Sequence, residues 1–237
     1  MEKKRNIAVV LAGGMGTRMG MDVPKQLLKL GGRTVLEYSL DAFQMHSLID
    51  EITLVASPHI EGEVRRILRK GRYDKVRRVL NGGKERSDST RAALQAFGDI
   101  SDHNANAVNL IFHDAVRPLV SQRIIDDVCA ALQSQQAVAV AVSSRDTIFE
   151  VRGDSIRAIP NRANLMCAQT PQAFRLSVIR RAYEGAMHDP HFVATDDCGV
   201  VLRYLPEVSI HIVPGDDRNI KMTYRNDIAV MESLLNK

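Results

Sequence analysis

Residues 11–26, with the sequence LAGGMGTRMGMDVPKQ, place four glycines and two cationic side chains in one segment that directly follows an apolar run. Glycines let backbone amides approach a polyphosphate closely, because a Cβ would hold the anion away. Arg18 and Lys25 add positive charge that a purely structural glycine turn does not need. Met19 stands where a dinucleotide-binding fingerprint needs its third glycine, and no Gly-Lys-Ser/Thr of a P-loop follows. We therefore expect a phosphate-binding loop of another kind.

A second group of polar residues ends the apolar run at residues 107–112, where His113 and Asp114 follow. Asp114 could help to hold hydrated Mg²⁺ or accept hydrogen bonds from substrate hydroxyls, and Arg117 could pair with it or with a phosphate. A salt bridge at the end of a strand is the structural alternative. We assign His113 to packing or hydrogen bonding, because transfer between phosphates requires no strong base.

The elements that must position these residues alternate along the chain. Apolar, β-rich runs separated by stretches of helical period occur at residues 7–12, 51–57, 76–83, 107–114 and 137–142. This alternation is typical of a wound, mostly parallel sheet with helices on both faces. Ligands of such sheets bind beyond the carboxyl ends of the strands, where the glycine loop and Asp114 both fall.

The alternation of strands and helices breaks off after the last of these strands. Two β-like runs flank the Arg-Gly-Asp at residues 152–154, which is a hairpin signal, and irregular chain then leads to a helix at residues 176–188. We expect an arm of about residues 144–168 that projects from the sheet. A late strand at residues 207–216 and a helix at residues 227–237 complete the expected order.

Composition limits the class of protein. The 237 residues are 45% hydrophobic and 25% charged, without repeats or Pro/Gly linkers, so we expect one domain over residues 1–237. A net charge of +4 suits an anionic small substrate and argues against a nucleic-acid partner. No apolar window reaches the roughly 18 to 20 residues of a membrane span, and residues 1–6 lead directly into a strand. We therefore expect a cytoplasmic protein with no membrane partner. The three cysteines share no metal-ligand spacing and are interpreted as reduced thiols.

Residues 12–26 resemble the A-G-G-x-G-x-R-M-x(n)-P-K signature of nucleotidyltransferases that couple a nucleoside triphosphate to a sugar or polyol phosphate. Seven further motifs follow in the order seen in cytidylyltransferases that act on alditol phosphates, so the resemblance covers essentially the whole chain. They are NGGKERSDS at 81–89, HDAVRP at 113–118, RDT at 145–147, NR at 161–162, QTPQAF at 169–174, TDD at 195–197 and NIK at 219–221. The resemblance implies an α/β, single-domain, Rossmann-like nucleotidyltransferase fold, with a mostly parallel wound sheet and a projecting β-hairpin arm.

The reaction that this resemblance implies is in-line attack of a phosphomonoester oxygen on the α-phosphorus of CTP, giving a CDP-alditol and pyrophosphate. Catalysis then rests on positioning and on charge stabilisation by cationic side chains and Mg²⁺, with other divalent cations as alternatives. By resemblance, Arg18 and Lys25 stabilise the transition state, while Lys221 and Arg162 orient the incoming phosphate. We expect Lys25 to be an exposed ligand whose replacement lowers turnover far more than stability.

The resemblance also implies two binding sets. CTP would contact Ala12, Gly13, Gly14, Gly16, Thr17, Arg18, Lys25, Gly83, Lys84, Ser89 and Asp114. The polyol phosphate would contact Asp114, Ala115, Arg117, Thr147, Arg162, Thr195 and Lys221. Asp114 is the implied protein ligand of the metal, which the CTP phosphates would otherwise hold. Lys84 departs from the acidic residue that is common in the isoprenoid enzymes, although a backbone contact there would survive. A strand-to-helix loop capped by Ser87 is the structural alternative for this segment.

Thr147 and Arg162 lie on the expected arm. In the resembling families this arm crosses to a second subunit and completes its polyol-phosphate site, so the resemblance implies a homodimer. Thr195 and Asp196 would contact polyol hydroxyls, whereas Asp197 is interpreted as the start of a helix.

Two groups of the family compete for this chain: the 2-C-methyl-D-erythritol 4-phosphate cytidylyltransferases of isoprenoid synthesis, and the ribitol-5-phosphate cytidylyltransferases, which make CDP-ribitol for cell-surface polymers. Several details lean to ribitol 5-phosphate. Gly13 stands where the isoprenoid enzymes usually carry alanine, DTI lacks a following lysine, IPNRA replaces T-x-D-R, and VRP follows His-Asp-Ala. The Ser-Asp-Ser at residues 87–89 and Ala115 suit the isoprenoid enzymes instead.

Two further classes of function stay open at this point. A nicotinamide oxidoreductase is disfavoured by the failed dinucleotide fingerprint. A non-catalytic nucleotide-sensing module would bind CTP without releasing pyrophosphate.

Overall fold

The apolar run near the N-terminus forms a central strand, β1 (Arg5–Ala12), of which all residues but the first are buried. The computed structural model describes residues 4–14, 23–71 and 73–235. Strand β1 pairs in parallel with β4 (Glu51–Ala56) on one side and β6 (Val108–Asp114) on the other. Near-continuous isoleucine, valine and alanine is what a strand covered on both faces requires.

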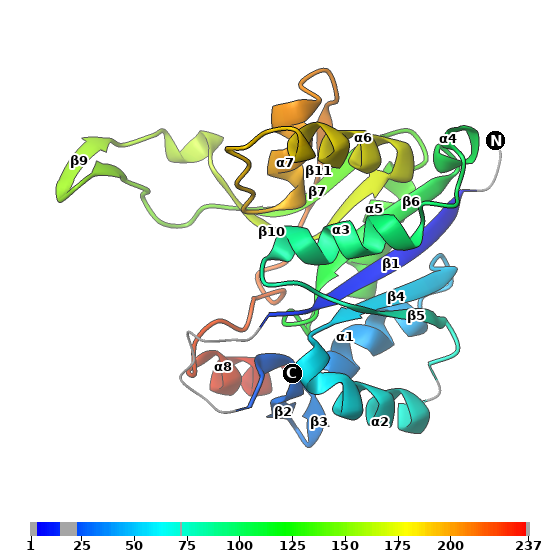
Figure 1. Ribbon diagram of the computed structural model, residues 1–237. Helices are drawn as coiled ribbons and strands as arrows, with labels where there is room; N and C mark the ends of the chain where they lie inside the picture. The colour runs from blue at the N-terminus through cyan, green and yellow to red at the C-terminus, as the bar shows by residue number, and fades with distance from the viewer. Residues whose placement is uncertain (1–3, 15–22, 72, 236–237) are drawn as a thin grey trace.

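Seven described strands form one sheet in the order β11-β7-β10-β6-β1-β4-β5 (Figure 1). The remaining members are β5 (Val76–Asn81), β7 (Ala137–Ser143), β10 (Met166–Arg175) and β11 (Ile210–Pro214). Strand β5 pairs in parallel with β4, and β11 pairs in parallel with β7. The predicted α/β fold with a mostly parallel sheet is therefore confirmed.

Strand β10 corrects the sequence-based prediction, which placed irregular chain there. It lies antiparallel between β6 and β7. Pro171 lacks a backbone N–H and argues against a central strand. In the structure, Pro171 falls where the pairing with β7 shifts register between Ala168 and Gln172, so the ladder does not need its missing donor.

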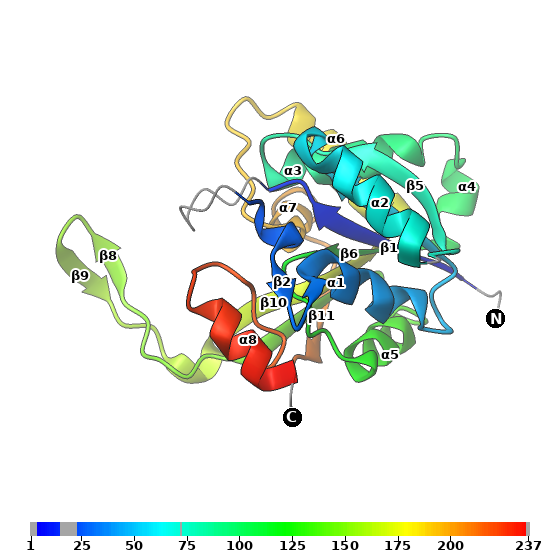
Figure 2. The same ribbon diagram turned by 90° about the horizontal axis from the view of Figure 1, so that it is seen from below.

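Helices cover both faces of the sheet (Figures 1 and 2). One face carries α1 (Val35–Gln44), α2 (Glu61–Gly71) and α5 (Gln122–Ala131). The other carries α3 (Arg86–Ala96), α4 (Asp102–Ala105), α6 (Leu176–Met187) and α7 (Asp197–Tyr204). The prediction of a helix beginning at Asp197 is confirmed. Short 3₁₀ helices occur at η2 (Lys25–Leu27), η3 (Pro58–Ile60) and η4 (Arg162–Asn164).

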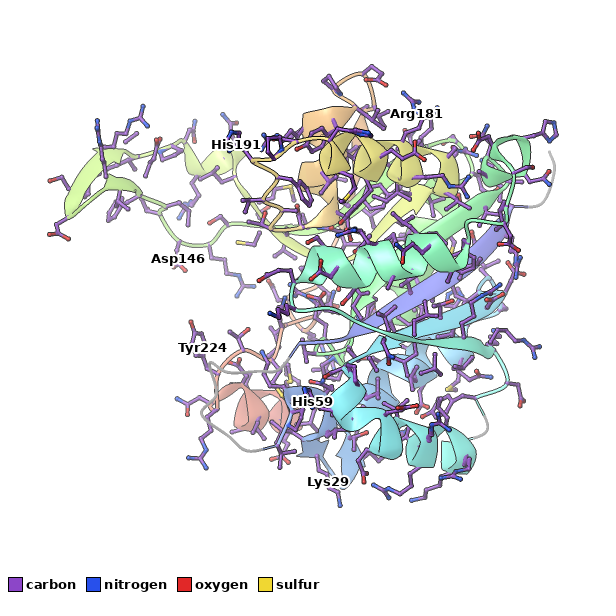
Figure 3. All side chains as sticks on the ribbon, in the orientation of Figure 1. Lys29, His59, Asp146, Arg181, His191 and Tyr224 are labelled. Carbon is purple, nitrogen blue, oxygen red and sulfur yellow. The ribbon has the colours of Figure 1, made fainter. Side chains whose placement is uncertain are left out.

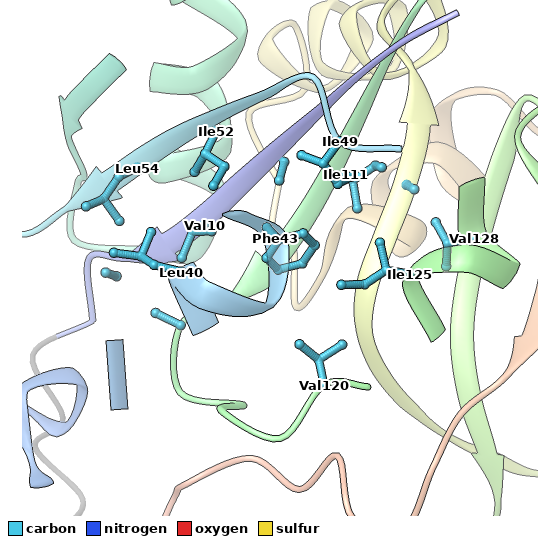
Figure 4. Close-up of a cluster of buried hydrophobic side chains, with 14 of the residues drawn as sticks. Val10, Leu40, Phe43, Ile49, Ile52, Leu54, Ile111, Val120, Ile125 and Val128 are labelled. Atoms are coloured by element: carbon cyan, nitrogen blue, oxygen red, sulfur yellow. The ribbon is translucent and has the colours of Figure 1, made fainter. Parts of the chain in front are cut away.

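Side chains alternate between the two hydrophobic cores, as the period of a β-strand demands. Along β1, Val10 points to the core that α1 and α5 cover, and this core also contains Phe43 and Ile125 (Figure 4). Val9 points to the opposite core, against α3 and α6. The sheet is thus a rigid platform whose strand ends present the polar residues.

A smaller cluster joins the two ends of the chain. It consists of Leu28, Leu30, Val35, Met222 and Met231. Leu28 follows the glycine loop, Leu30 belongs to the hairpin of β2 (Lys29–Leu30) and β3 (Arg33–Thr34), and Val35 begins α1. Met222 precedes α8 (Asp227–Leu235), and Met231 lies within it. This cluster brings the neighbourhood of Lys25 against that of Lys221.

The predicted arm, residues 144–168, projects from the sheet (Figures 1 and 2). Its tip is the hairpin of β8 (Glu150–Arg152) and β9 (Ser155–Ala158), and Gly153 adopts the positive φ of 58° that this turn needs. Large apolar side chains stand exposed along it: Ile148, Phe149, Val151, Ile156 and Ile159. Within the part of the chain that is described, no helix combines the length and apolarity needed to cross a bilayer.

Candidate active site

A pocket opens at the carboxyl ends of β1 and β6, where the sequence places the glycine loop and Asp114. We call it the glycine pocket. Its walls are Leu11, Ala12, Gly13, Gly14, Lys25, Gln26, Gly83, Lys84, Glu85, Arg86, Ser89, Asp114, Val116 and Lys221. The arm starts on the same side of the molecule, where Asp146 and Tyr224 also lie, whereas Arg181 on α6 lies away from it (Figure 3).

Glycines allow two backbone segments to approach each other at the floor of this pocket. A Cβ on Gly13 would lie 2.9 Å from Ser89 Oγ, and a Cβ on Gly82 would lie 2.8 Å from the same atom. Such distances are shorter than real Cβ contacts allow, so a substitution would force the Ser89 hydroxyl to move. The end of β1 and the loop before α3 therefore meet here without side chains between them.

Lys25 is the buried cation of the glycine pocket, with 6% of its surface exposed. Its Nζ donates a hydrogen bond of 3.1 Å to the backbone oxygen of Met222. The expectation of an exposed Lys25 is therefore wrong, because the segment around Met222 covers it. The adjacent Gln26 donates from Nε2 to the oxygens of Ala12, at 2.8 Å, and Gly14, at 3.2 Å. Gln26 thereby ties the end of the glycine loop to its beginning.

Asp114, at the end of β6, is surrounded by three cations. Its carboxylate lies 2.8 Å from Lys221 Nζ, 3.5 Å from Arg86 Nε and 3.9 Å from Arg117 Nε. Burial alone would raise the pKa of Asp114, but the charges of Arg86 and then Lys221 outweigh burial and hold this pKa well below its usual range. Asp114 is therefore ionised throughout the neutral range.

His113 holds the backbone around Asp114. Its Nε2 donates to the Arg117 oxygen at 3.1 Å, because a carbonyl can only accept, which leaves Nδ1 to accept from the Thr170 hydroxyl at 3.0 Å. The same hydroxyl oxygen accepts from the Asp114 N–H at 3.1 Å. Burial lowers the pKa of His113 to about 4, so the ring is neutral at pH 7. The prediction of a packing and hydrogen-bonding role for His113 is confirmed.

A second pocket adjoins the glycine pocket on the side of β10, and we call it the β10 pocket. It is lined by Arg86, Asp114, Arg117, Ala168, Gln169, Thr170, Gln172, Thr195, Asp196 and Lys221. Three side chains line both pockets: Arg86, Asp114 and Lys221. A ligand in one pocket would therefore meet a ligand in the other across these three side chains.

Most of the predicted binding residues that are described gather at these pockets, and a few do not. Gly16, Thr17 and Arg18 lie outside the described residues. Ala115 lies outside both pockets, because its methyl group is in the hydrophobic core, its N–H donates to Leu11 and its oxygen accepts from Ser39 Oγ. Thr147 and Arg162 are exposed on the arm, where Arg162 donates to the oxygen of Arg145 at 3.0 Å.

Three residues of the site were not predicted from the sequence: Gln26, Arg86 and the anchoring role of Asp197. Arg86 stands inside the motif NGGKERSDS, between residues predicted to contact CTP, so a signal for it was present. Asp197 is completely buried and accepts from Arg86 Nη1 at 2.6 Å. A carboxylate at the first residue of a helix is so common that its sequence position alone carries no such signal.

Known proteins of one family match this chain over nearly its whole length. The model of the 2-C-methyl-D-erythritol 4-phosphate cytidylyltransferase family matches residues 6–237. A protein of that name from Thermobifida fusca is 50% identical, with 98% of this chain and 94% of that protein covered. A bifunctional ribulose 5-phosphate reductase/CDP-ribitol pyrophosphorylase from Haemophilus influenzae is 42% identical over 99% of this chain and 49% of its own length.

Solved structures agree. The crystal structure of 4-diphosphocytidyl-2C-methyl-D-erythritol synthase from Anaerococcus prevotii superposes with a TM-score of 0.84 at 31% identity, covering 100% of both chains. Together with the collinear site motifs, these matches show a CTP-using nucleotidyltransferase. The chain belongs to the 2-C-methyl-D-erythritol 4-phosphate cytidylyltransferase family.

Proposed function

We propose that this protein joins CTP to 2-C-methyl-D-erythritol 4-phosphate and releases pyrophosphate. The observation that carries the proposal is the pair of adjoining pockets that share Arg86, Asp114 and Lys221. Two polyanions must be brought together in this reaction, and these shared residues stand at the junction with two cations and one carboxylate. The family model and the relative that is 50% identical both carry the name of the enzyme for this acceptor.

The names of the relatives favour 2-C-methyl-D-erythritol 4-phosphate over ribitol 5-phosphate, the acceptor to which details of the sequence point. Those details are spread over the site: Gly13 and Val116 line the glycine pocket, Arg117 lines the β10 pocket, and the DTI and IPNRA segments belong to the arm. The relative that includes a CDP-ribitol pyrophosphorylase is less similar, at 42% identity. Because of this relative, ribitol 5-phosphate is the acceptor with which 2-C-methyl-D-erythritol 4-phosphate should be compared in an assay.

The chemistry follows from charge. An oxygen of the acceptor phosphate forms a bond to the α-phosphorus of CTP while the bond from that phosphorus to the bridging oxygen of pyrophosphate breaks. Lys25, in the glycine pocket, stabilises charge on the triphosphate, and Arg18 from the same loop adds to it. Lys221 and Arg117, at the β10 pocket, orient the acceptor phosphate. No side chain needs to act as a nucleophile or strong base.

A magnesium ion fits this arrangement as a partner of the nucleotide. Among the described residues, no group of three or more histidine, cysteine or acidic side chains could hold a metal by itself. Mg²⁺ is usually held by one or two carboxylates together with substrate phosphates and water, and Asp114 is a carboxylate at the right place for that mode. When bound, the ion would neutralise charge on the triphosphate.

The assay that tests the proposed function supplies CTP, Mg²⁺ and one acceptor at a time, and measures pyrophosphate release. We expect turnover with 2-C-methyl-D-erythritol 4-phosphate, at a kcat/KM at least about tenfold above that for ribitol 5-phosphate, since their differing methyl and hydroxyl groups contribute only a few kcal/mol. A preference for ribitol 5-phosphate would reverse the assignment of acceptor. Folded protein that is inactive with both acceptors would refute the function.

We also propose that the protein works as a homodimer through the arm. A two-stranded hairpin on its own is only marginally stable in water, and this hairpin together with its flanking segments exposes five large apolar side chains. A second copy of the chain would cover them. Arg162, which lies on the arm and donates only to a backbone oxygen among the described hydrogen bonds, would then reach the acceptor phosphate of the other subunit.

Paired variants test whether Arg162 serves the site of the other subunit. Arg162→Ala should lower kcat/KM for the acceptor by about 10- to 100-fold, because one charge-assisted phosphate contact is lost. A heterodimer of one Arg162→Ala subunit and one Lys25→Met subunit, purified with two affinity tags, should recover about half of the wild-type activity, since one of its two sites is then complete.

The control for this pair is Arg157→Ala, which removes another exposed arginine of the arm, paired with Glu150 at 2.7 Å. It should leave activity within about twofold of wild type. A heterodimer as inactive as its parents would mean that Arg162 serves its own subunit. A monomer with full activity would refute the dimer.

A further inference from the structure

Arg86 stands at the junction of the two pockets, although no motif assigned it a role. It is the first residue of α3, and its side chain is 20% exposed. It lines the glycine pocket and the β10 pocket alike. Arg86 therefore stands where the two pockets adjoin.

The contacts of Arg86 are divided between two carboxylates. Nη1 donates to Asp197 Oδ2 at 2.6 Å, Nε lies 3.5 Å from Asp114 Oδ1, and Nη2 is buried without a hydrogen-bond partner. An arginine that served only to neutralise Asp197 would normally present two parallel N–H groups to it. The guanidinium therefore spans the gap between the two carboxylates.

Asp197 is a fixed anchor for this bridge. It is completely buried, and its Oδ1 accepts from Thr90 Oγ1 at 2.9 Å and from the Tyr183 hydroxyl at 2.7 Å. Its backbone N–H donates to Gln172 Oε1 at 3.1 Å. Residues of α3 and α6 therefore hold the carboxylate and Gln172 of β10 holds the backbone of Asp197, so this carboxylate cannot follow a moving substrate.

The three cations around Asp114 differ in their freedom to move. The side chain of Lys221 is 37% exposed and, among the residues that the structure describes, forms an ion pair with Asp114 alone. Arg117 is already engaged with the backbone oxygens of Asn219 and Ala168. When an acceptor phosphate arrives, Lys221 can turn to it, whereas Arg86 stays with Asp114 because Asp197 holds its other end.

We propose that Arg86 is a positioning residue that keeps the Asp114 carboxylate fixed and charge-compensated between the two pockets, with Asp197 as its buried anchor. This role rests on the proposed function, because its effect is read in the same transfer reaction. In this scheme Arg86 acts through Asp114, and chiefly on the acceptor.

The test must separate positioning from folding. Arg86→Gln alone would leave Asp197 as a buried, unpaired charge, so the variant to use is Arg86→Gln with Asp197→Asn, which removes both charges. We expect this double variant to melt near the wild-type temperature, and to have a KM for the acceptor raised by about tenfold and a kcat lowered by about tenfold. The Kd for CTP, measured by calorimetry, should change by less than about threefold.

The control is Arg91→Gln, on the same helix, where the arginine is 39% exposed and 3.8 Å from Asp88. It should match the wild type in every constant. Asp197→Asn alone is the second variant, which keeps Arg86 and weakens its anchor, and it should show a smaller loss in the same direction.

Wild-type kinetic constants in the double variant would overturn the proposal, as would equal losses of CTP and acceptor affinity. If the double variant does not fold, wild-type kinetics in folded Asp197→Asn would overturn it instead. Because every effect is measured against an active wild type, failure of the function itself would appear separately, as inactivity of the unmodified protein.

Discussion

Replacing Lys25 by methionine is expected to lower kcat by about 10³-fold at saturating CTP, the largest loss for any single described residue. The Lys25 side chain is buried in the wall of the glycine pocket, where a charge interacts with a developing phosphorane far more strongly than it would in water. Methionine keeps the approximate length and volume of the side chain and removes its charge together with its N–H donors. The measurement is pyrophosphate release under single-turnover conditions, which isolates the chemical step.

Burial of Lys25 also changes what is expected for stability. Loss of the hydrogen bond to Met222 leaves a backbone oxygen without this donor, which should lower the free energy of unfolding by about 1 to 2 kcal/mol. The matched control is Lys29→Met, an exposed lysine on β2 four positions away (Figure 3). It should change neither quantity measurably. A Lys25→Met enzyme that keeps a tenth of the wild-type kcat would make this residue structural.

Asp114→Asn is expected to lower kcat/KM for the acceptor by about 10²- to 10³-fold. The amide keeps the shape of the carboxylate but leaves Arg86, Arg117 and Lys221 around a neutral group, so the cations repel one another and Lys221 loses its partner. The effect should persist from pH 6 to pH 9, because Asp114 is ionised throughout that range in the wild type. A loss that vanished at either end of this range would contradict the assignment.

The stability of this variant gives an independent check. The pKa of Asp114 is lowered in the folded state, so its contribution to stability is present above its ordinary value of 3.8 and is lost as the pH falls below it. Asp114→Asn should therefore be less stable than wild type at pH 7, with the difference shrinking in acid. Urea unfolding at pH 7 and pH 3 measures this difference. Asp127→Asn, an exposed carboxylate on α5 paired with Arg123, is the control.

The sequence was sufficient to predict the wound sheet, because its central parallel strands β1 and β4 are nearly continuous apolar runs separated by stretches of helical period. The arm was also predictable, since Arg-Gly-Asp between two β-like runs is a local turn signal that Gly153 fulfils. Strand β10 was not predictable in this way. Its Pro171 contradicts the local rule, and only the register shift opposite β7, which is a tertiary feature, removes the contradiction.

Part of the site could likewise be predicted from the sequence, and part could not. Glycines and cations in one loop indicate a phosphate, whereas a bridge such as Asp114–Arg86–Asp197 joins residues as many as 111 positions apart and depends on how α3, α6 and α7 pack. Gly13 was one of the details that pointed to ribitol 5-phosphate, whereas the relatives favour 2-C-methyl-D-erythritol 4-phosphate. In the structure, the close approach of Gly13 to Ser89 and Gly82 accounts for this glycine through backbone packing.

The hydrogen bond between Lys25 and Met222 joins residues 197 positions apart, so it can form only after both segments have been synthesised. Lys25 leaves the ribosome well before the segment that covers it and carries Lys221. Chains fold progressively during synthesis, but contacts of such long separation must wait for their second partner. A nascent chain therefore lacks this wall of the glycine pocket until the segment around Met222 has been made.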